Sequence, residues 1–594
     1  MRLPEMTELQ TSRDILDVFA GYNHNLRIGN GEFYDMKNLS SSNYPILAPR
    51  GKRGVYASPA NPQGLVQYDT LSYVDGSQFV VNGYPVDMGL SVEEEDCPKQ
   101  LIRMGAYVII LPDKKYINLT DLTDFGAIEA VIGKKSGNDV SVDFEMCKVD
   151  GSMHENVHKS PSEPIVTEDM EDIPLWLDTS SKPHALKQYS KSMSAWTTIA
   201  TTYVKLTFAG YTEESPIPFA EGDGVTIDGI ENEQLSDLNN TMVIWSRGFN
   251  YIVVTGICDE LVTQDTGISV SRLMPTMDFV IEANNRLWGC RYGKALNGEV
   301  VNEIYASKLG DFRNWNCFAG ISTDSYAATV GTDGEFTGAI THLGYPLFFK
   351  ERYLHKVYGQ FPANYQINTT VCRGVQEGSH KSLAIVNEVL YYKSGTAVCA
   401  YDGSLPSEIS YALGEVAYSD AVAGGHGNKY YISMRNDAGE WSLIVYDAAK
   451  GMWHKEDATR AEAFCSCRGD LYFIDHADKK IKTVLGSGDE KESGSLDWMA
   501  ETGLIATDSP DHKYISKLNI RMSVDVGTKV FVFAEYDSSG VWELLWNMSS
   551  AVLRSFTIPI KPKRCDHMRL RITGTGDAKI FSIAKTTEEG SDWK

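Results

Sequence analysis

Few residues in this chain have the types and spacing that chemistry requires. A phosphate loop needs four residues between its glycines, followed directly by Gly-Lys-Ser or Gly-Lys-Thr. In GAIEAVIGKKS (residues 126–136) six residues separate the glycines, and a second lysine precedes the serine. Backbone amides at that spacing cannot form the phosphate cradle, so we interpret the segment as a polar turn.

Metal ligands also need fixed spacing, and two clusters come closest to it. His154 and His158 form one, and Cys465 and Cys467 with His476 form the other. A structural zinc site requires a second matched pair of ligands, and neither cluster is followed by one. We therefore predict a solvated loop around the two histidines, cysteines that pack or face solvent, and no metal or cofactor.

Hydrolytic chemistry finds no clear residues either. A glycosidase needs two carboxylates of different pKa beside the scissile bond, but 79 Asp and Glu residues leave no way of choosing a pair. We find no Asp-box repeat of the sialidase kind, and no GxSxG nucleophile elbow. We predict no catalytic residue and a protein that is not an enzyme.

Three tryptophans near the C-terminus allow a different kind of site. Trp498, Trp542 and Trp546 could stack on sugar rings, but a sandwich of this size normally holds one or two tryptophans in its interior. We interpret them as core residues and keep sugar binding as the alternative.

The composition narrows the classes of partner. The net charge of −24 argues against a surface that coats duplex DNA, because phosphate binding depends on Lys and Arg. Two interpretations remain open: a wall that repels DNA and lets it slide past, or an ordinary acidic soluble protein. The charged start MRLPEMTELQTSRD has no apolar export region, and the longest apolar run, AYVIIL (residues 106–111), is too short to span a bilayer.

The ten cysteines are spread irregularly without a CxxC pair, which is typical of reduced thiols in a protein made in the cytoplasm.

The elements that must position these residues are short strands. An apolar strand, a tight turn and a second apolar strand recur, and from residue 343 onward they do so at intervals of roughly 40 residues, the period of propeller blades. The units lie at residues 68–83, 104–121, 284–292, 343–359, 386–403, 427–447 and 467–485. We predict an all-β protein with a β-propeller of about six to eight blades; the alternative is a set of unrelated hairpins in sandwiches.

The period fails in one stretch and the pattern changes at the end. We predict an N-terminal segment with the first blades over residues 1–122, an inserted small β-rich domain over 123–273, the remaining blades over 274–490 and a C-terminal β-sandwich over 491–594. KLNIRMSV (517–524) and HMRLRITG (567–574) alternate apolar and polar residues, as sandwich strands do. One short helix is expected near Ser12 to Phe19, with Ser12 as its N-cap.

Several segments, taken in order, resemble a family of phage tail proteins. GEFYDMKNLSSSNYPILAPRGKRG (31–54) resembles the family's opening, and four later segments resemble the repeats of phage DNA-stabilisation, tail-hub and nozzle proteins. These segments are EANNRLWGC (282–290), IYASKLGDFRNW (304–315), HLGYPLFFKERYLHKVYG (342–359) and GSHKSLAIVNEVLYYKSGTAVCAYDG (378–403).

The resemblance implies a structural virion protein of the tail, assembled in the host cytoplasm. It implies a homo-oligomeric ring that contacts the portal, the adaptor and other tail proteins, retains packaged DNA and conducts it at ejection without sequence-specific binding. Arg50, Lys52 and Arg53 lie in the matched opening, where inter-blade ion pairs and DNA contact are both open.

Two competing hypotheses remain. A receptor-binding or baseplate protein would use the C-terminal sandwich to hold a host-surface glycan. A propeller glycosidase would act on that glycan.

Overall fold

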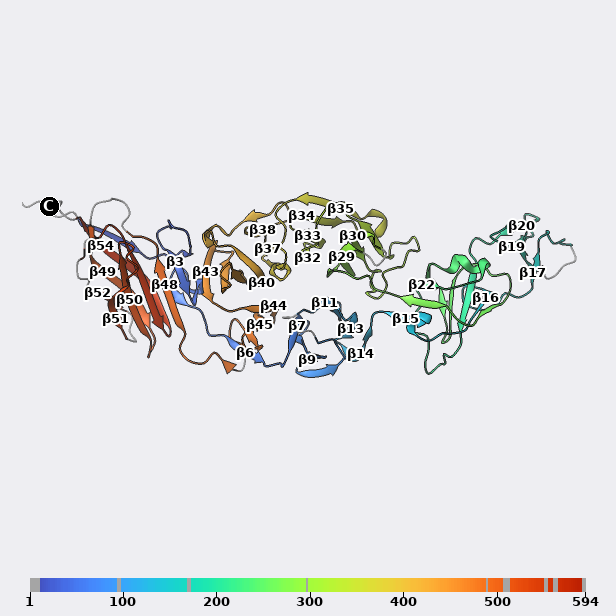
Figure 1. The fold of residues 1–594 in the computed structure, drawn as a ribbon, viewed down its shortest axis with the longest axis horizontal. Helices are drawn as coiled ribbons and strands as arrows, with labels where there is room; N and C mark the ends of the chain where they lie inside the picture. Colours follow the sequence, from blue (N-terminus) through green and yellow to red (C-terminus); the bar gives the residue numbers. More distant parts are fainter. Residues whose placement is uncertain are drawn as a thin grey trace, which may run out of the picture.

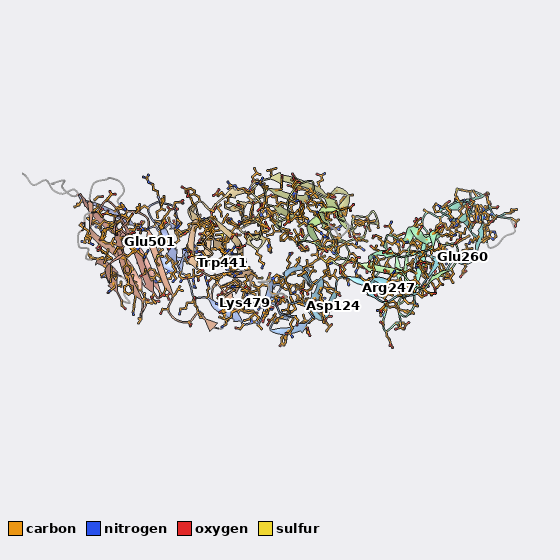
Figure 2. The ribbon with its side chains drawn as sticks, viewed as in Figure 1. Asp124, Arg247, Glu260, Trp441, Lys479 and Glu501 are labelled. Atoms are coloured by element: carbon orange, nitrogen blue, oxygen red, sulfur yellow. The ribbon has the colours of Figure 1, made fainter. Side chains whose placement is uncertain are left out.

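The computed structural model describes residues 11–92, 98–167, 173–294, 298–487, 490–505, 513–549, 554–558, 563 and 565–589. These residues form short β-strands, tight turns and single-turn 3-10 helices, which confirms the all-β class. Three modules lie in a row along the long axis: a sandwich with the C-terminal strands, a ring of sheets, and the insertion (Figure 1). Figure 2 locates them by Glu501, Lys479 and Glu260, respectively. The first ten residues of the charged start lie outside the described residues.

The central module is a β-propeller, as predicted, with seven blades among the described residues. Each blade is an antiparallel meander in which successive strands are neighbours. The first three blades contain β7 (Pro62–Gln67), β8 (Leu71–Asp75), β9 (Gln78–Val81) and β10 (Tyr84–Asp87); β11 (Gln100–Met104), β12 (Tyr107–Leu111), β13 (Lys115–Asn118) and β14 (Asp121–Ala127); and β28 (Phe279–Ala283), β29 (Arg286–Lys294), β30 (Val300–Ala306) and β31 (Tyr326–Thr329).

The remaining blades follow without a break. They contain β32 (Gly338–His342), β33 (Tyr345–Lys350), β34 (Tyr353–Tyr358) and β35 (Gln366–Val371); β36 (Ala384–Val386), β37 (Val389–Lys393), β38 (Val398–Tyr401) and β39 (Ser407–Glu408); β40 (Tyr418–His426), β41 (Lys429–Asn436), β42 (Trp441–Asp447) and β43 (Met452–Asp457); and β44 (Ala461–Cys467), β45 (Asp470–Asp475) and β46 (Ile481–Thr483). The seventh blade also takes in β6 (Gly54–Ala57) and β47 (Glu490–Lys491).

The ring closes through its first strands and its last sheet. β7 lies beside both β11 and β44, so the first blade contacts the second and the seventh. β6, from the N-terminal segment, pairs with β46 near the end of the propeller. Each blade buries its faces against its neighbours, as where Phe349 of the fourth blade packs 5.1 Å from Tyr392 of the fifth. The propeller core is therefore a series of interfaces between blades.

The insertion leaves the propeller after β14 and returns at β28. Its entry strand β15 (Ala130–Gly133) and exit strand β27 (Ser269–Arg272) pair antiparallel, so the chain leaves and re-enters at one place. Two sheets enclose one apolar core. The stretch of chain that connects β16 to β21 forms a third, separate sheet. The other elements are β16 (Val142–Cys147), β17 (Val157–Ser160), β18 (Leu175–Asp178), β19 (Ala185–Ser190), β20 (Ala195–Thr198), β21 (Tyr203–Phe208), β22 (Gly224–Asp228), β23 (Thr241–Val243), β24 (Ser246–Arg247), β25 (Tyr251–Thr255), β26 (Val262–Gln264), η2 (Lys134–Ser136) and η3 (Glu233–Leu238).

The terminal sandwich is built from both ends of the chain. One sheet contains β1 (Thr11–Leu16), β54 (Ala578–Glu589), β49 (Lys513–Val524) and β52 (Arg554–Ile558); the other contains β2 (Gly21–Tyr22), β3 (Glu32–Lys37), β48 (Asp497–Thr502), β53 (Met568–Thr575), β50 (Lys529–Tyr536) and β51 (Glu543–Met548). The sandwich expected over 491–594 is thus completed by three N-terminal strands. β2 and β3 also pack on β43, which joins the sandwich core to the sixth blade.

The helix expected near Ser12 to Phe19 is wrong. Residues 11–16 form β1, which pairs antiparallel with β54, Arg13 opposite Thr586. The open edge of β54 offers a ladder of backbone hydrogen bonds, and a local capping signal does not compete with that ladder.

The short elements left over lie between the sandwich and the ring or in connections within the ring. They are β4 (Leu39–Ser40), β5 (Ala48–Pro49), η1 (Ser41–Asn43), η4 (Pro362–Asn364), η5 (His380–Ser382) and η6 (Tyr411–Leu413). Among the described helices, none is long and apolar enough to cross a bilayer.

Candidate functional site

One face of the propeller is spanned by the connection between β35 and β36, which we call the axial segment (residues 376–383). Its His380 ring lies 5.2 Å from the ring of Phe279 in the third blade. Its Lys381 Nζ donates to the backbone oxygen of Glu462 in the seventh blade, at 3.2 Å. The Ser379 Oγ accepts from the backbone N–H of Ala421 in the sixth blade. Because one short segment contacts blades on opposite sides of the ring, it covers the axis at this face.

Burial keeps the histidine of the axial segment uncharged. The pKa of His380 is lowered to about 4, chiefly by desolvation, so its ring is uncharged at neutral pH. Nothing in the sequence of this segment reveals that it crosses the ring.

The seventh blade carries a buried carboxylate beside the axial segment. Glu462 is 4% exposed, and its Oε1 accepts from His476 Nδ1 at 2.7 Å and from Lys479 Nζ. Arg460 lies 3.0 Å from the other ring nitrogen of His476. His476 therefore takes part in an ion network and is not paired with the two nearby cysteines as a ligand.

The cysteines of that cluster are protonated thiols. Burial raises the pKa of Cys465 to about 12 and also raises that of Cys467, so both stay protonated at neutral pH. Within the described part of the chain no group of three or more His, Cys, Asp or Glu side chains is placed to hold a metal ion.

The remaining candidate motifs lie in the insertion and play structural parts there. His158 is exposed on β17, and His154 precedes that strand, half-buried, with its pKa lowered by desolvation. In the segment at 126–136, the Lys135 ammonium pairs with Asp228 at 3.0 Å, and Ser136 Oγ donates to the Gly133 oxygen. Neither group is turned toward a phosphate-sized cradle of backbone amides.

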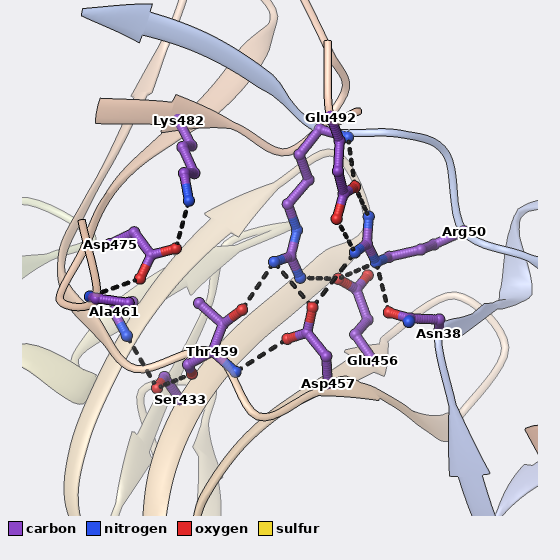
Figure 3. A network of polar contacts seen from close by, with 12 residues as sticks. Asn38, Arg50, Ser433, Glu456, Asp457, Thr459, Ala461, Asp475, Lys482 and Glu492 are labelled. Atoms are coloured by element: carbon purple, nitrogen blue, oxygen red, sulfur yellow. Dashed lines mark hydrogen bonds and ion pairs between the residues drawn. The ribbon is translucent and has the colours of Figure 1, made fainter. Parts of the chain in front are cut away.

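The two arginines of the N-terminal motif point inward, whereas Lys52 is exposed. Arg50 pairs with Glu492 at 2.9 Å and Asp457 at 3.3 Å, and Arg53 pairs with Glu456 at 2.8 Å (Figure 3). Both arginine side chains are more than nine-tenths buried.

These ion pairs fasten the segment between the sandwich and the ring to the end of the sixth blade. Of the two roles left open, ion pairing is the one in which the structure places Arg50 and Arg53. The Lys52 ammonium donates to the backbone oxygen of Gly494.

The three tryptophans of the sandwich differ. Trp498 is buried and its indole N–H donates to the Gly576 oxygen, and Trp546 packs 5.3 Å from Phe556 in the core. Trp542 lies outside the core instead, half-buried, with the guanidinium of Arg571 3.9 Å from its ring centroid. The core interpretation therefore holds for two of the three.

The outer face around Trp542 is a network of charges and aromatic rings. Arg569 bonds Glu501 at 2.8 Å and Glu535 at 2.5 Å, and Arg571 bonds Glu501 at 2.7 Å. An aromatic ring stacked on two fixed guanidinium groups presents a flat, partly polar surface.

A hollow of about 490 Å³ lies between the second and third blades, at the base of the insertion. Asp278 lines it, and desolvation raises the pKa of Asp278, although the backbone N–H of Tyr292 and the charge of Arg291 act in the opposite direction. A carboxyl of raised pKa is one of the two groups that general acid catalysis by paired carboxylates needs. Sequence patterns carried no signal for this residue, because only burial separates Asp278 from the other acidic residues.

The fold and these features define a large all-β protein built on a propeller. No protein-family profile matches the chain, and no curated protein sequence matches it. Similar solved structures include a family 43 arabinoxylan arabinofuranohydrolase from Bacillus subtilis in complex with cellotetraose, at 8% identity, covering 51% of this chain and 94% of that one with a TM-score of 0.15.

Two further glycoside hydrolases are similar to this chain. An engineered family 43 enzyme with endo-xylanase and exo-arabinofuranosidase activity matches at 7% identity, covering 52% of this chain and 96% of that one, with a TM-score of 0.19. Another matches at 11% identity, covering 51% and 83%, with a TM-score of 0.17.

These comparisons correct the prediction that the chain is not an enzyme. Three of the similar solved structures are glycoside hydrolases. At these identities and TM-scores the likeness concerns the fold alone and assigns no residue a catalytic role.

Proposed function

We propose that this chain is a structural subunit of a phage tail, in the hub or nozzle ring. In that role copies of the chain form a closed ring that extends the DNA channel below the portal and adaptor, retains packaged DNA and conducts it at ejection. The observation that carries the proposal is the arrangement of modules in a row, with the sandwich and the insertion at opposite ends of the propeller (Figure 1). Copies of an elongated subunit can pack side by side around a symmetry axis and form a closed ring.

The contacts between the modules support a mechanical role for the chain. The sandwich core continues into the sixth blade, and the Arg50 and Arg53 ion pairs fasten the connecting segment. The insertion is held by two paired strands, β15 and β27.

The distribution of charge supports passage of DNA without adhesion. Residues 123–273 contain 24 Asp and Glu against 10 Lys and Arg, so this quarter of the chain carries −14 of the net −24. An acidic insertion facing a channel would repel phosphates and keep the duplex from sticking to the wall.

Electron microscopy of intact particles, with this polypeptide located by labelling or density fitting, tests the proposal. A closed ring on the tail axis, enclosing DNA or a channel as wide as a duplex, is the expected result. A peripheral position, on appendages that contact host glycan, would refute it.

The second candidate is a receptor-binding or baseplate protein, and the half-buried Trp542 on the outer face of the sandwich favours it. Aromatic rings of this kind stack on sugars. Saturable binding of host-surface polysaccharide that Trp542→Ala abolishes would support this candidate, and binding unaffected by the substitution would remove it.

A further inference from the structure

The sandwich sheet of β1, β54, β49 and β52 has a positively charged outer side, which we call the basic face. Side chains along these strands alternate between the core and the solvent, and Leu518, Ile520 and Ile583 mark the core side. Among the described side chains, the charged ones on the solvent side are all cations: Arg13, Lys517, Arg521 and Lys579. All four are exposed, and none makes an ion pair with another described residue.

The residues between these cations are small, which keeps the basic face flat. They are Asn519, Ser523, Ser582, Ala584 and Thr586. Lys517 and Arg521 are four residues apart on β49, which is about 13 Å at the rise of a strand. A broad surface can therefore approach several of the charges at once, and a surface of opposite charge would be attracted to them.

The basic face lies at one end of the molecule. The other sandwich sheet packs on the sixth blade through β3, which leaves the basic face on the far side from the propeller. Figure 1 shows β54, β49 and β52 at one end of the long axis and the insertion at the opposite end. Residues 491–594 contain 14 Lys and Arg and 14 Asp and Glu, so this end is neutral in a chain of net charge −24.

The insertion carries the complementary charge. Residues 206–246 contain eight Asp and Glu and no Lys or Arg. Two of these carboxylates are paired within the chain, Asp223 with Arg272 and Asp228 with Lys135. The other six are exposed and make no ion pair with a described residue: Glu213, Glu214, Glu221, Glu231, Glu233 and Asp237.

Three of the six lie in residues 231–237, which we call the acidic segment. β22 and β23 pair antiparallel with Gly224 opposite Val243, and the acidic segment belongs to the connection at the other end of this pair. The Gly224 N–H donates to Asn314 Oδ1 of the third blade at 2.9 Å, so the Gly224 end is the one next to the propeller. The acidic segment therefore lies on the side of the insertion that faces away from the propeller and the sandwich.

We propose that the basic face of one copy binds the acidic segment of a second copy, so that copies of this chain join end to end. At an ionic strength of about 0.15 M the Debye length is about 8 Å, so repulsion between the distant charges of two acidic molecules is screened while opposite charges in contact still attract. The contact is heterologous, because each copy offers one surface of each kind. It goes beyond the proposed ring, in which copies pack side by side, and does not depend on that ring.

Sedimentation velocity of the full chain, from about 10 to 200 µM in about 0.15 M NaCl, tests the contact. Lys517→Glu with Arg521→Glu reverses the charge of the basic face. Glu231→Lys with Glu233→Lys and Asp237→Lys reverses that of the acidic segment. All five side chains are exposed, so thermal unfolding should be the same as in the wild type.

Matched controls reverse exposed charges of the propeller. Lys294→Glu with Arg352→Glu is the control for the basic face, and Glu415→Lys with Asp437→Lys is the control for the acidic segment. Lys517→Gln with Arg521→Gln removes the same two cations without adding repulsion, so it tests the basic face with less disturbance of folding.

The wild type should self-associate, and the association should weaken in about 1 M NaCl. Each set of reversals should weaken it at least about tenfold and the glutamine pair several-fold, whereas the controls should leave it unchanged. An equimolar mixture of the two reversed proteins should associate again, because the intact acidic segment of one meets the intact basic face of the other.

A wild-type chain that stays monomeric at about 200 µM overturns the proposal. Association that survives reversal of the acidic segment, or a mixture of the reversed proteins that stays monomeric, overturns it as well. A chain that does not self-associate but binds a short DNA duplex or vesicles of anionic phospholipid, and loses this binding on reversal of the basic face, would assign the basic face to phosphate groups and also overturn the proposal.

Discussion

Replacing His454 with phenylalanine should remove about 2 kcal/mol of the stability that the protein loses between pH 7 and pH 5. His454 lies in β43, is 1% exposed, and neither ring nitrogen has a hydrogen-bond partner among the described residues. Burial, together with the charge of Lys429, lowers its pKa to about 3, from the ordinary histidine value of 6.5. The ring is therefore neutral in the folded protein across the physiological range.

The sign follows from proton binding. Between pH 6.5 and pH 3 the unfolded chain binds a proton at His454 and the folded chain does not, so stability falls as the pH falls through this window. At pH 5 the difference of about 1.5 pH units below 6.5 corresponds to about 2 kcal/mol, and at pH 7 the effect is close to zero. His355 and His380, whose pKa values are lowered to about 4 by burial, add similar losses and remain in the variant.

Urea unfolding at pH 7 and pH 5, followed by tryptophan fluorescence, measures the effect. The decrease in unfolding free energy between the two pH values should be about 2 kcal/mol smaller in His454→Phe than in the wild type. The side chain lines a cavity of about 10 Å³, which gives the phenyl ring space. The exposed His158, replaced by Asn, is the control for loss of a histidine. An identical pH dependence in His454→Phe and wild type would show that His454 is not held neutral by burial.

Three further perturbations test other parts of the structure. Arg53→Leu leaves the Glu456 side chain, which is 4% exposed, without its partner at 2.8 Å and should lower stability by about 3–5 kcal/mol, whereas Lys52→Ala should cost under about 1 kcal/mol. Thermal unfolding measures both losses, and equal shifts would contradict a stabilising role for the buried Arg53–Glu456 ion pair. Gly133→Ala, at φ +81° with the Ile268 oxygen 2.1 Å from the added Cβ, should destabilise the insertion strongly, whereas Gly137→Ala, at φ +87° with open space around it, should cost only about 1–2 kcal/mol. Limited proteolysis of the insertion measures the difference, and similar cleavage rates in the two variants would count against the steric argument. Cys465, whose pKa is raised to about 12 by burial, should react with iodoacetamide at pH 8 far more slowly in the folded than in the urea-unfolded protein, as peptide mass spectrometry would show, and equal rates would refute its burial.

The parts of the fold that depend on local pattern could be predicted from the sequence. The alternation in KLNIRMSV and HMRLRITG corresponds to the sandwich strands β49 and β53, whose alternate side chains are buried. The propeller could be predicted because each blade repeats a hairpin, and each hairpin needs turn residues of the same kinds.

What could not be predicted depends on contacts between distant residues. β1 lies in a sheet with β54, more than 500 positions later, and its own six residues fit a helix or a strand equally well. The raised pKa of Asp278 has the same origin, because it results from burial by other connections. Arg50 and Arg53 looked alike as DNA ligands or ion-pair partners until Glu456 and Glu492 were placed beside them.

The pairing of β6 with β46 cannot form until most of the chain has been synthesised. Residues 54–57 emerge early from the ribosome, but their partners at 481–483 follow more than 400 residues later. At roughly 5–20 residues per second, the N-terminal strand waits tens of seconds for its place. Pairings this distant in sequence are slow to form and leave strand edges open in the meantime. Newly made chains therefore pass through a period in which a chaperone, or a neighbouring nascent chain, can pair with the unpartnered strand β6.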